Sequence, residues 1–106
     1  MKELDLRKVT DEVERMCIEG NYFIGKEVLD KIKEAYAKEE SEVGKNILGQ
    51  IIENDEIAMN EQVPMCQDTG IVVVFLEIGT EVKINGDIYE AVNEGVRRGY
   101  EKGYLR

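Results

Sequence analysis

The sequence predicts an α+β fold: a helix-rich N-terminal half packed on a small, incomplete β-sheet, with one further helix at the C-terminus. Three observations lead to this prediction. Apolar residues recur at helical spacing before residue 60, one β-branched run follows at 71–78, and a second helical pattern covers 88–102. A lone strand cannot satisfy its own backbone groups, so further chain or a partner strand is expected to complete the sheet. Residues 1–106 are therefore expected to form the front section of a larger unit.

Three helices are predicted before the strand. The first runs from Leu4 to Glu19, where apolar residues lie on one face until Gly20-Asn21 breaks the pattern. The second spans Lys26 to Ala37. Ser41 is a credible N-cap for the third, which extends to about Asn60. The predicted buried stripe of this third helix consists of Val43, Ile47, Leu48, Ile51, Ile52 and Ala58.

The second half of the chain alternates between turn signals and regular elements. Pro64 lies past the third helix, so a loop is expected there. The run Ile71–Ile78 is typical of a strand covered on both faces. Glu81 to Ile84 is predicted as a second, short strand, and Asn85-Gly86-Asp87 signals a tight turn. Asp87 then caps a last helix over Ile88 to Lys102.

Gly95, Gly99 and Gly103 lie four residues apart on one side of the last helix. An interior glycine costs a helix about 1 kcal/mol relative to alanine. Close approach of a neighbouring backbone would compensate for this cost, so tight helix packing is predicted along this side.

Composition is that of an ordinary soluble protein and argues against several functions. Hydrophobic residues make up 42% and charged residues 35% of the 106 residues. The net charge of −9 would repel phosphate backbones, which argues against a nucleic-acid partner. The longest apolar run, Ile71 to Leu76, is far shorter than the roughly 20 residues of a membrane helix. The N-terminus lacks an apolar signal core, so a cytoplasmic location is expected.

Two cysteines and no histidine limit the metal and redox chemistry of the chain. A disulfide framework is not expected in a cytoplasmic chain, and two thiols alone cannot complete a four-ligand zinc site. Cys17 falls on the apolar face of the first helix and is predicted to be a core residue. Cys66 lies in a loop between Pro64 and two polar residues, a setting that favours a ligand. Any metal centre must borrow ligands from outside residues 1–106.

The segment Pro64–Gly70 places a thiol, an amide and a carboxylate side by side. Its Asp-Thr-Gly triplet also occurs in dimeric aspartic proteases, where an apolar strand leads into the aspartate. Here Met65, Cys66 and Gln67 precede the triplet, after a mostly helical half, so that interpretation is disfavoured. Nucleophilic catalysis by Cys66 is also disfavoured, because the chain has no histidine to generate the thiolate.

The heptapeptide Pro-Met-Cys-Gln-Asp-Thr-Gly, followed by an apolar strand, resembles the hallmark of the iron–sulfur hydro-lyases of the class I fumarase and L-tartrate dehydratase family. The resemblance covers the whole chain, including Gly44 and Asn54 of the third helix and the closing Gly-Tyr-Leu-Arg. It implies that residues 1–106 are the N-terminal section of the alpha-type part. The reaction it implies is the reversible removal of water from a hydroxy-dicarboxylate, either malate or L-tartrate.

The resemblance also implies roles for individual residues. Cys66 corresponds to the first of three cysteines that ligate a [4Fe-4S] cluster. Gln67 and Asp68 match residues that contact the bound substrate, and Asp68 is the candidate for a catalytic role in proton transfer. Arg106 matches an arginine that grips a substrate carboxylate, a task that suits its planar guanidinium. The family's other two cluster cysteines lie later in the alpha part, so this chain alone is expected to be inactive and without a cluster.

The partners implied are the rest of the alpha part, a beta-type subunit or domain and a small dicarboxylate, in a homo- or hetero-oligomer. The alternative hypothesis is a non-catalytic, acidic helical module that binds another protein. That alternative predicts that Cys66 is buried among apolar groups. An open cavity shared by Cys66, Asp68 and Arg106 would count against it.

Overall fold

The computed structural model describes residues 2–66 and 69–106. Within these residues lie four helices and two short strands. Their order along the chain is β1 (Lys2–Leu4), α1 (Leu6–Tyr22), α2 (Lys26–Lys38), α3 (Glu42–Glu61), β2 (Val82–Ile84) and α4 (Ile88–Lys102). Helices dominate and the sheet is small, which confirms the predicted α+β class.

The two strands pair in parallel, with Leu4 opposite Ile84. The predicted short strand is therefore present, as Val82–Ile84. Its partner β1 was not predicted, and the sequence pattern assigns Leu4, the last residue of β1, to the first helix. Asp5 separates the two elements, because its carboxylate accepts the Arg7 N–H at 3.0 Å and caps α1. The helix consequently begins at Leu6, and the predicted start at Leu4 is wrong.

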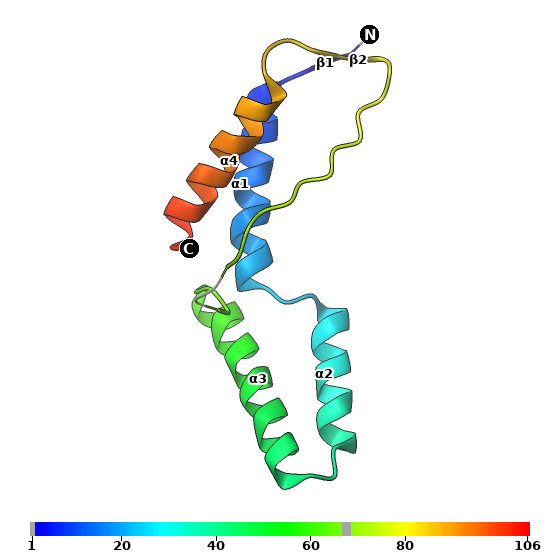
Figure 1. Cartoon of the computed structure of the whole chain (residues 1–106), viewed down its shortest axis with the longest axis vertical. Coiled ribbons are helices and arrows are strands. Elements are labelled where there is room, and N and C mark those ends of the chain that lie inside the picture. The colour runs from blue at the N-terminus through cyan, green and yellow to red at the C-terminus, as the bar shows by residue number, and fades with distance from the viewer. Residues whose placement is uncertain (1, 67–68) are drawn as a thin grey trace.

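The predicted strand over Ile71–Ile78 is also wrong: in the described residues this segment lies outside any sheet and runs as a long, winding trace (Figure 1). The expected burial on both faces is absent, since the side chain of Ile71 is 90% and that of Phe75 92% exposed. β-branched residues favour a strand, but a strand is stable only when a neighbouring strand pairs with its backbone groups. Here β1 and β2 pair with each other, at the other end of this trace (Figure 1).

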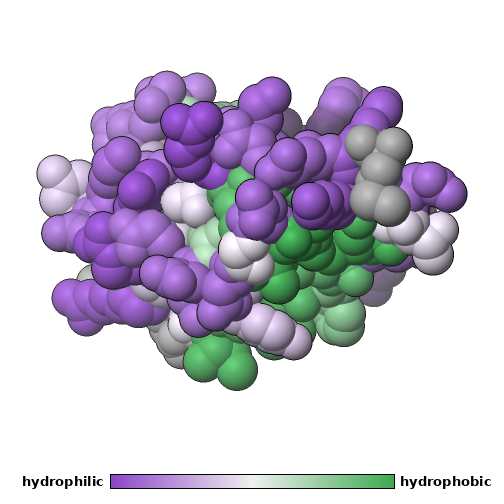
Figure 2. Space-filling model, turned by 90° about the horizontal axis from the view of Figure 1, so that it is seen from above, coloured by the Kyte–Doolittle hydropathy of each residue, from purple (hydrophilic) through white to green (hydrophobic). Residues whose placement is uncertain are grey.

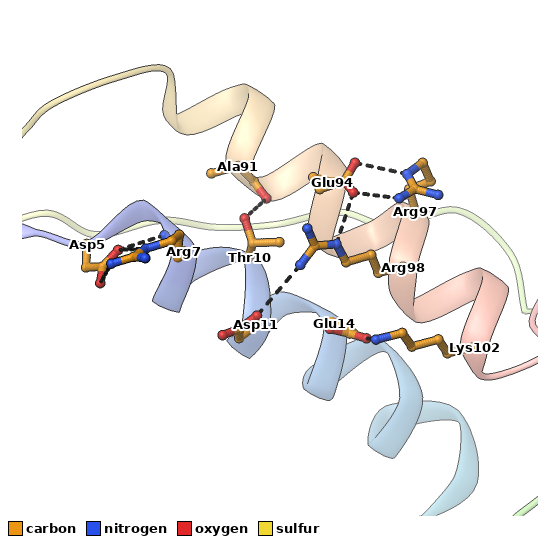
Figure 3. A network of polar contacts seen from close by, with 10 residues as sticks. All are labelled: Asp5, Arg7, Thr10, Asp11, Glu14, Ala91, Glu94, Arg97, Arg98 and Lys102. Atoms are coloured by element: carbon orange, nitrogen blue, oxygen red, sulfur yellow. Dashed lines mark hydrogen bonds and ion pairs between the residues drawn. The ribbon is translucent and has the colours of Figure 1, made fainter.

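α1 and α4 lie side by side and make the most extensive contact between two elements (Figure 1). A Cβ added at Gly95 would lie 2.7 Å from the Thr10 carbonyl oxygen, and one at Gly99 would lie 2.8 Å from Cys17 Cβ. The buried Thr10 hydroxyl donates to the Ala91 carbonyl oxygen at 2.8 Å, across the same interface (Figure 3). The tight packing predicted for the glycine side of the last helix is therefore confirmed.

Charged side chains border this interface (Figure 3). Lys102 Nζ lies 2.7 Å from Glu14 Oε1, and Arg98 Nη1 lies 3.8 Å from Asp11 Oδ1. The Arg98–Asp11 pair is exposed on both sides, and a pair of this kind is worth roughly 0–1 kcal/mol, whereas the side chain of Glu14 is only 14% exposed. The close approach of the two backbones and these ion pairs therefore act at the same interface.

α2 and α3 form a helical hairpin at the opposite end of the molecule from β1 and β2 (Figure 1). Ser41 Oγ accepts the Gly44 N–H at 3.3 Å, which confirms the predicted N-cap. The predicted buried stripe of α3 is only partly correct, because Ala58 is buried whereas Val43 is 71% exposed and Ile47 is exposed as well. A single neighbouring helix covers too little of α3 to bury the whole stripe.

The molecule is elongated, with extents of 58 × 28 × 21 Å and a radius of gyration of 18.0 Å. A compact domain of this length has a radius of gyration of about 13 Å. The accessible surface is 8134 Å², whereas a compact monomer of this mass exposes about 6,000 Å². Seen from above, part of this surface is strongly apolar (Figure 2). No helix in the described residues is long and apolar enough to cross a membrane.

Candidate functional site

The loop after α3 places Cys66 where α1 and α3 meet. Met65, directly before the cysteine, is held through both of its backbone groups. Its N–H donates to the Asn21 carbonyl oxygen at 2.8 Å, and its carbonyl oxygen accepts from Asn54 Nδ2 at 2.8 Å. Asn21 lies in the last turn of α1, where its side chain donates to the Cys17 carbonyl oxygen at 2.7 Å. Two helices thus fix the backbone that enters Cys66.

Cys66 is exposed and lines an open hollow of about 360 Å³. Arg106 lines the same hollow, so two predicted site residues from distant parts of the sequence come together. The hollow is completed by Asn54, Pro64, Met65 and Tyr104. Gln67 and Asp68, the other two predicted site residues, lie outside the described residues. The exposure of Cys66 contradicts the burial that the protein-binding alternative predicts.

A tight turn after α4 leads the chain into the hollow. The Leu105 N–H donates to the Tyr100 carbonyl oxygen at 2.9 Å, and Tyr104 has a left-handed backbone with φ of 57°. This is a Schellman arrangement, in which glycine usually occupies the left-handed position. Tyr22 Oη donates to the Gly103 carbonyl oxygen at 2.9 Å, which ties the turn to α1.

Thr69 connects the cysteine loop to Arg106. The Arg106 N–H donates to Thr69 Oγ1 at 2.7 Å, and the same hydroxyl donates to the Arg106 carbonyl oxygen. Tyr100 Oη donates to the Thr69 carbonyl oxygen at 3.4 Å. Gly70 follows with φ of 68°, a left-handed conformation that glycine adopts without strain, and it redirects the chain toward 71–78. The loop and the end of α4 are therefore joined at Thr69.

Cys17 does not line the hollow that Cys66 and Arg106 share. It is half-buried where α1 approaches α4, so the predicted core position is only partly correct, and this burial raises the pKa of its thiol. It lines a separate cavity of about 450 Å³ together with Tyr100 and residues 71–75. Among residues 2–66 and 69–106, no group of three or more His, Cys, Asp or Glu side chains is placed to hold a metal ion.

Several residues around the hollow carry no recognisable signal in the sequence. Asn21 is visible only as part of the predicted Gly20-Asn21 break and Tyr100 only as a helix residue, and their contacts depend on which helix ends meet in space. Thr69 is visible in the sequence only as part of the Asp-Thr-Gly triplet, and Asn54 only through the family resemblance. A left-handed residue would have been expected at a glycine, yet it is Tyr104 that adopts this conformation.

Sequence comparisons decide the family. A sequence model described as Fumarate hydratase (Fumerase) matches residues 10–106. The chain belongs to the fumarate hydratase family. This result confirms the resemblance carried by the heptapeptide.

Relatives of this fumarate hydratase family member are alpha subunits by name. The chain is 42% identical over 101 residues to a Methanocaldococcus jannaschii protein provisionally named L(+)-tartrate dehydratase subunit alpha. It is 27% identical over 105 residues to the L(+)-tartrate dehydratase subunit alpha of Escherichia coli strain K12. These matches cover 93% and 99% of the chain but 35% of each relative. The chain thus spans about a third of the length of these proteins.

Proposed function

We propose that residues 1–106 are the N-terminal part of an iron–sulfur hydro-lyase that reversibly removes water from a hydroxy-dicarboxylate. The reaction is either malate to fumarate or L-tartrate to oxaloacetate. One observation carries the proposal: in a member of the fumarate hydratase family, Cys66, which is exposed, and Arg106 line the same open hollow.

Arg106 is proposed to bind a substrate carboxylate. Its guanidinium presents parallel N–H donors that match the two oxygens of a carboxylate. The chain carries a net charge of −9, so its overall field repels a dianion and a local cation is needed to hold the substrate. Gln67 is proposed to orient a carboxylate through hydrogen bonds, and Asp68 to take part in proton transfer or to hold another group in place.

Cys66 is proposed as one ligand of a [4Fe-4S] cluster. The residue fits this role because it is exposed and lines the hollow that Arg106 also lines, and because the backbone before it is held by α1 and α3. The described residues place no second cysteine at this hollow, so the remaining thiolates come from outside residues 1–106. A cluster held by three thiolates supplies Lewis acidity toward the hydroxyl that leaves the substrate.

The remaining two-thirds of the alpha part and a beta-type subunit or domain are proposed to cover the exposed surface and complete the enzyme. The relatives are named as alpha subunits, and the chain covers 35% of their length. The accessible surface of 8134 Å² exceeds that of a compact monomer of this mass by about 2,000 Å². An interface of standard size buries about 800 Å² per partner, so the excess is large enough for extensive contacts. We expect the assembled enzyme in the cytoplasm, as a homo- or hetero-oligomer.

The test is a comparison of two cysteine variants in the complete alpha and beta parts, expressed and purified without oxygen. Cys66→Ser is expected to lose the cluster, measured as iron and acid-labile sulfide, and to lose dehydration of both malate and L-tartrate. Cys17→Ser is the matched control, because Cys17 lies away from the hollow, and it is expected to keep both. Unchanged cluster content and activity in Cys66→Ser would end the proposal. In the unmodified enzyme, the ratio of malate dehydration to L-tartrate dehydration identifies the substrate.

A further inference from the structure

The hydroxyl of Thr69 bonds both backbone groups of a single distant residue. It accepts the Arg106 N–H at 2.7 Å and donates to the Arg106 carbonyl oxygen. A hydroxyl has one proton to donate and lone pairs to accept with, so this pair of bonds uses its donor and one of its acceptor positions. Two bonds from one side-chain atom to one residue fix the position of that residue's backbone relative to the loop.

Thr69 can act as an anchor because its own backbone is held by α4. Tyr100 Oη donates to the Thr69 carbonyl oxygen at 3.4 Å. The turn that follows α4 is tied to α1 through the hydrogen bond from Tyr22 to Gly103. Thr69 and Arg106 therefore belong to one connected unit, supported by the two helices that pack most closely.

The hydrogen bonds of Thr69 engage the backbone of Arg106 and leave its guanidinium available. In the part of the chain that the structure describes, no carboxylate lies within ion-pair distance of this guanidinium. An arginine whose backbone is fixed needs to order only its side chain when it binds a carboxylate. Fixing the backbone beforehand lowers the entropic cost of binding.

From this geometry we infer that Thr69 is a positioning residue for Arg106, and that it fixes the spacing between the guanidinium and the Cys66 loop. The inference rests on the proposed function, in which Arg106 holds one carboxylate of the substrate. Thr69 follows Cys66 by three positions, so the loop that carries the thiol also fixes the backbone of the arginine.

The test uses the complete enzyme and a pair of substitutions that separate the hydroxyl from the shape of the side chain. Thr69→Val keeps the branched shape and removes both hydrogen bonds, whereas Thr69→Ser keeps the hydroxyl. In Thr69→Val we expect KM for the dicarboxylate to rise about tenfold, the size expected for loss of hydrogen bonds that support a charged contact. We expect kcat to change less than KM and the iron and sulfide content to stay normal, because a binding interaction is lost. Thr69→Ser is expected to stay close to the unmodified enzyme.

Two further measurements distinguish positioning from a general structural role. Hydrogen–deuterium exchange of the peptide that contains Arg106 is expected to accelerate in Thr69→Val and to stay slow in Thr69→Ser. In an Arg106→Ala background, Thr69→Val is expected to raise KM no further, since the residue it positions is already gone.

An unchanged KM together with unchanged exchange in Thr69→Val would overturn the inference. Loss of the cluster in that variant would also overturn it, because Thr69 would then support the Cys66 loop rather than Arg106. If Thr69→Val fails to fold, Thr69→Ala and the Arg106→Ala cycle give the same decision. Failure of the proposed function is recognised separately, as absence of dehydration in the unmodified enzyme, while the exchange measurement still decides whether Thr69 holds Arg106.

Discussion

Single residues at the hollow are fixed by hydrogen bonds that join distant parts of the chain. Asn54 of α3 and Asn21 of α1 hold Met65, and Thr69 holds Arg106. The identity of Cys66 and Arg106 as candidates follows from the heptapeptide and the closing Leu-Arg, which are local patterns. The holding roles of Asn21 and Thr69 could not be predicted, because an asparagine at a helix end or a threonine in a loop has many equally ordinary roles in a sequence.

Asp55, next to Asn54 on α3, gives a prediction of pH dependence. The residue is 5% exposed, and its Oδ2 has no hydrogen-bond partner in the described residues. Burial raises the pKa of this carboxyl above its ordinary value of 3.8, while a hydrogen bond from Asn54 lowers it in part. The folded state therefore binds the proton more tightly than the unfolded state does. Stability contributed by the protonated carboxyl is fully present below pH 3.8 and is lost as pH rises through the raised value.

The check is chemical denaturation across this pH window. Asp55→Asn is expected to remove the loss of stability that accompanies ionisation of Asp55. The difference in free energy of unfolding, variant minus unmodified chain, is therefore expected to rise from acidic to neutral pH. Glu53→Gln is a control on the same helix, because Glu53 is exposed, and it is expected to change the free energy of unfolding little. Parallel pH profiles for the unmodified chain and Asp55→Asn would contradict the prediction.

Elements whose signals are local follow the sequence closely, and elements that depend on a distant partner do not. The predicted second helix has the same first residue as α2 and ends at Ala37, one residue short of the observed end at Lys38. Asp87 caps α4 as predicted, by accepting the Tyr89 and Glu90 N–H groups at 2.9 and 3.3 Å. Periodicity and capping residues lie within a few positions of each other, so they can be read from the sequence. The pairing of β1 with β2 and the unpaired state of 71–78 depend on which strand finds a partner, which no local pattern records.

The contact between α1 and α4 gives a prediction with an internal control. A Cβ at Gly95 would lie 2.7 Å from the Thr10 carbonyl oxygen and 2.7 Å from Val13 Cβ, so Gly95→Ala forces the two helices apart. The expected cost is about 1–3 kcal/mol of overpacking, which outweighs the gain of about 1 kcal/mol in helix propensity. At Gly20 of α1 a Cβ meets nothing within 4 Å, so Gly20→Ala is expected to be neutral or to stabilise the chain by up to about 1 kcal/mol.

Thermal unfolding followed by circular dichroism measures both glycine variants. We expect the midpoint to fall for Gly95→Ala and to stay or rise for Gly20→Ala. Equal effects at the two positions would show that helix propensity alone matters and that the close approach of α1 to α4 contributes little.

At the scale of the whole molecule, elongation and apolar exposure have one cause: two pairs of helices are joined with little common core. A radius of gyration of 18.0 Å leaves the chain about 5 Å larger than a compact domain of its length. The side chains of Ile71 and Phe75 are almost fully exposed on a segment whose β-branched composition suits a strand. An exposed apolar segment without a paired neighbour is a site for association with other chains.

The isolated chain is therefore expected to self-associate through 71–78. Phe75→Asp places a charge in the middle of this segment and is expected to shift the chain toward the monomer, measured by sedimentation velocity and light scattering over a range of concentrations. Tyr89→Ser is the matched control, because Tyr89 is an exposed aromatic residue of α4, outside the segment, and its loss is expected to leave association unchanged. Because the proposed remainder of the enzyme covers the exposed surface, and this segment is part of that surface, Phe75→Asp is also expected to weaken assembly of the complete enzyme while Tyr89→Ser does not. A chain that stays monomeric at all concentrations, or one whose association responds equally to both substitutions, would show that the segment is not the contact surface.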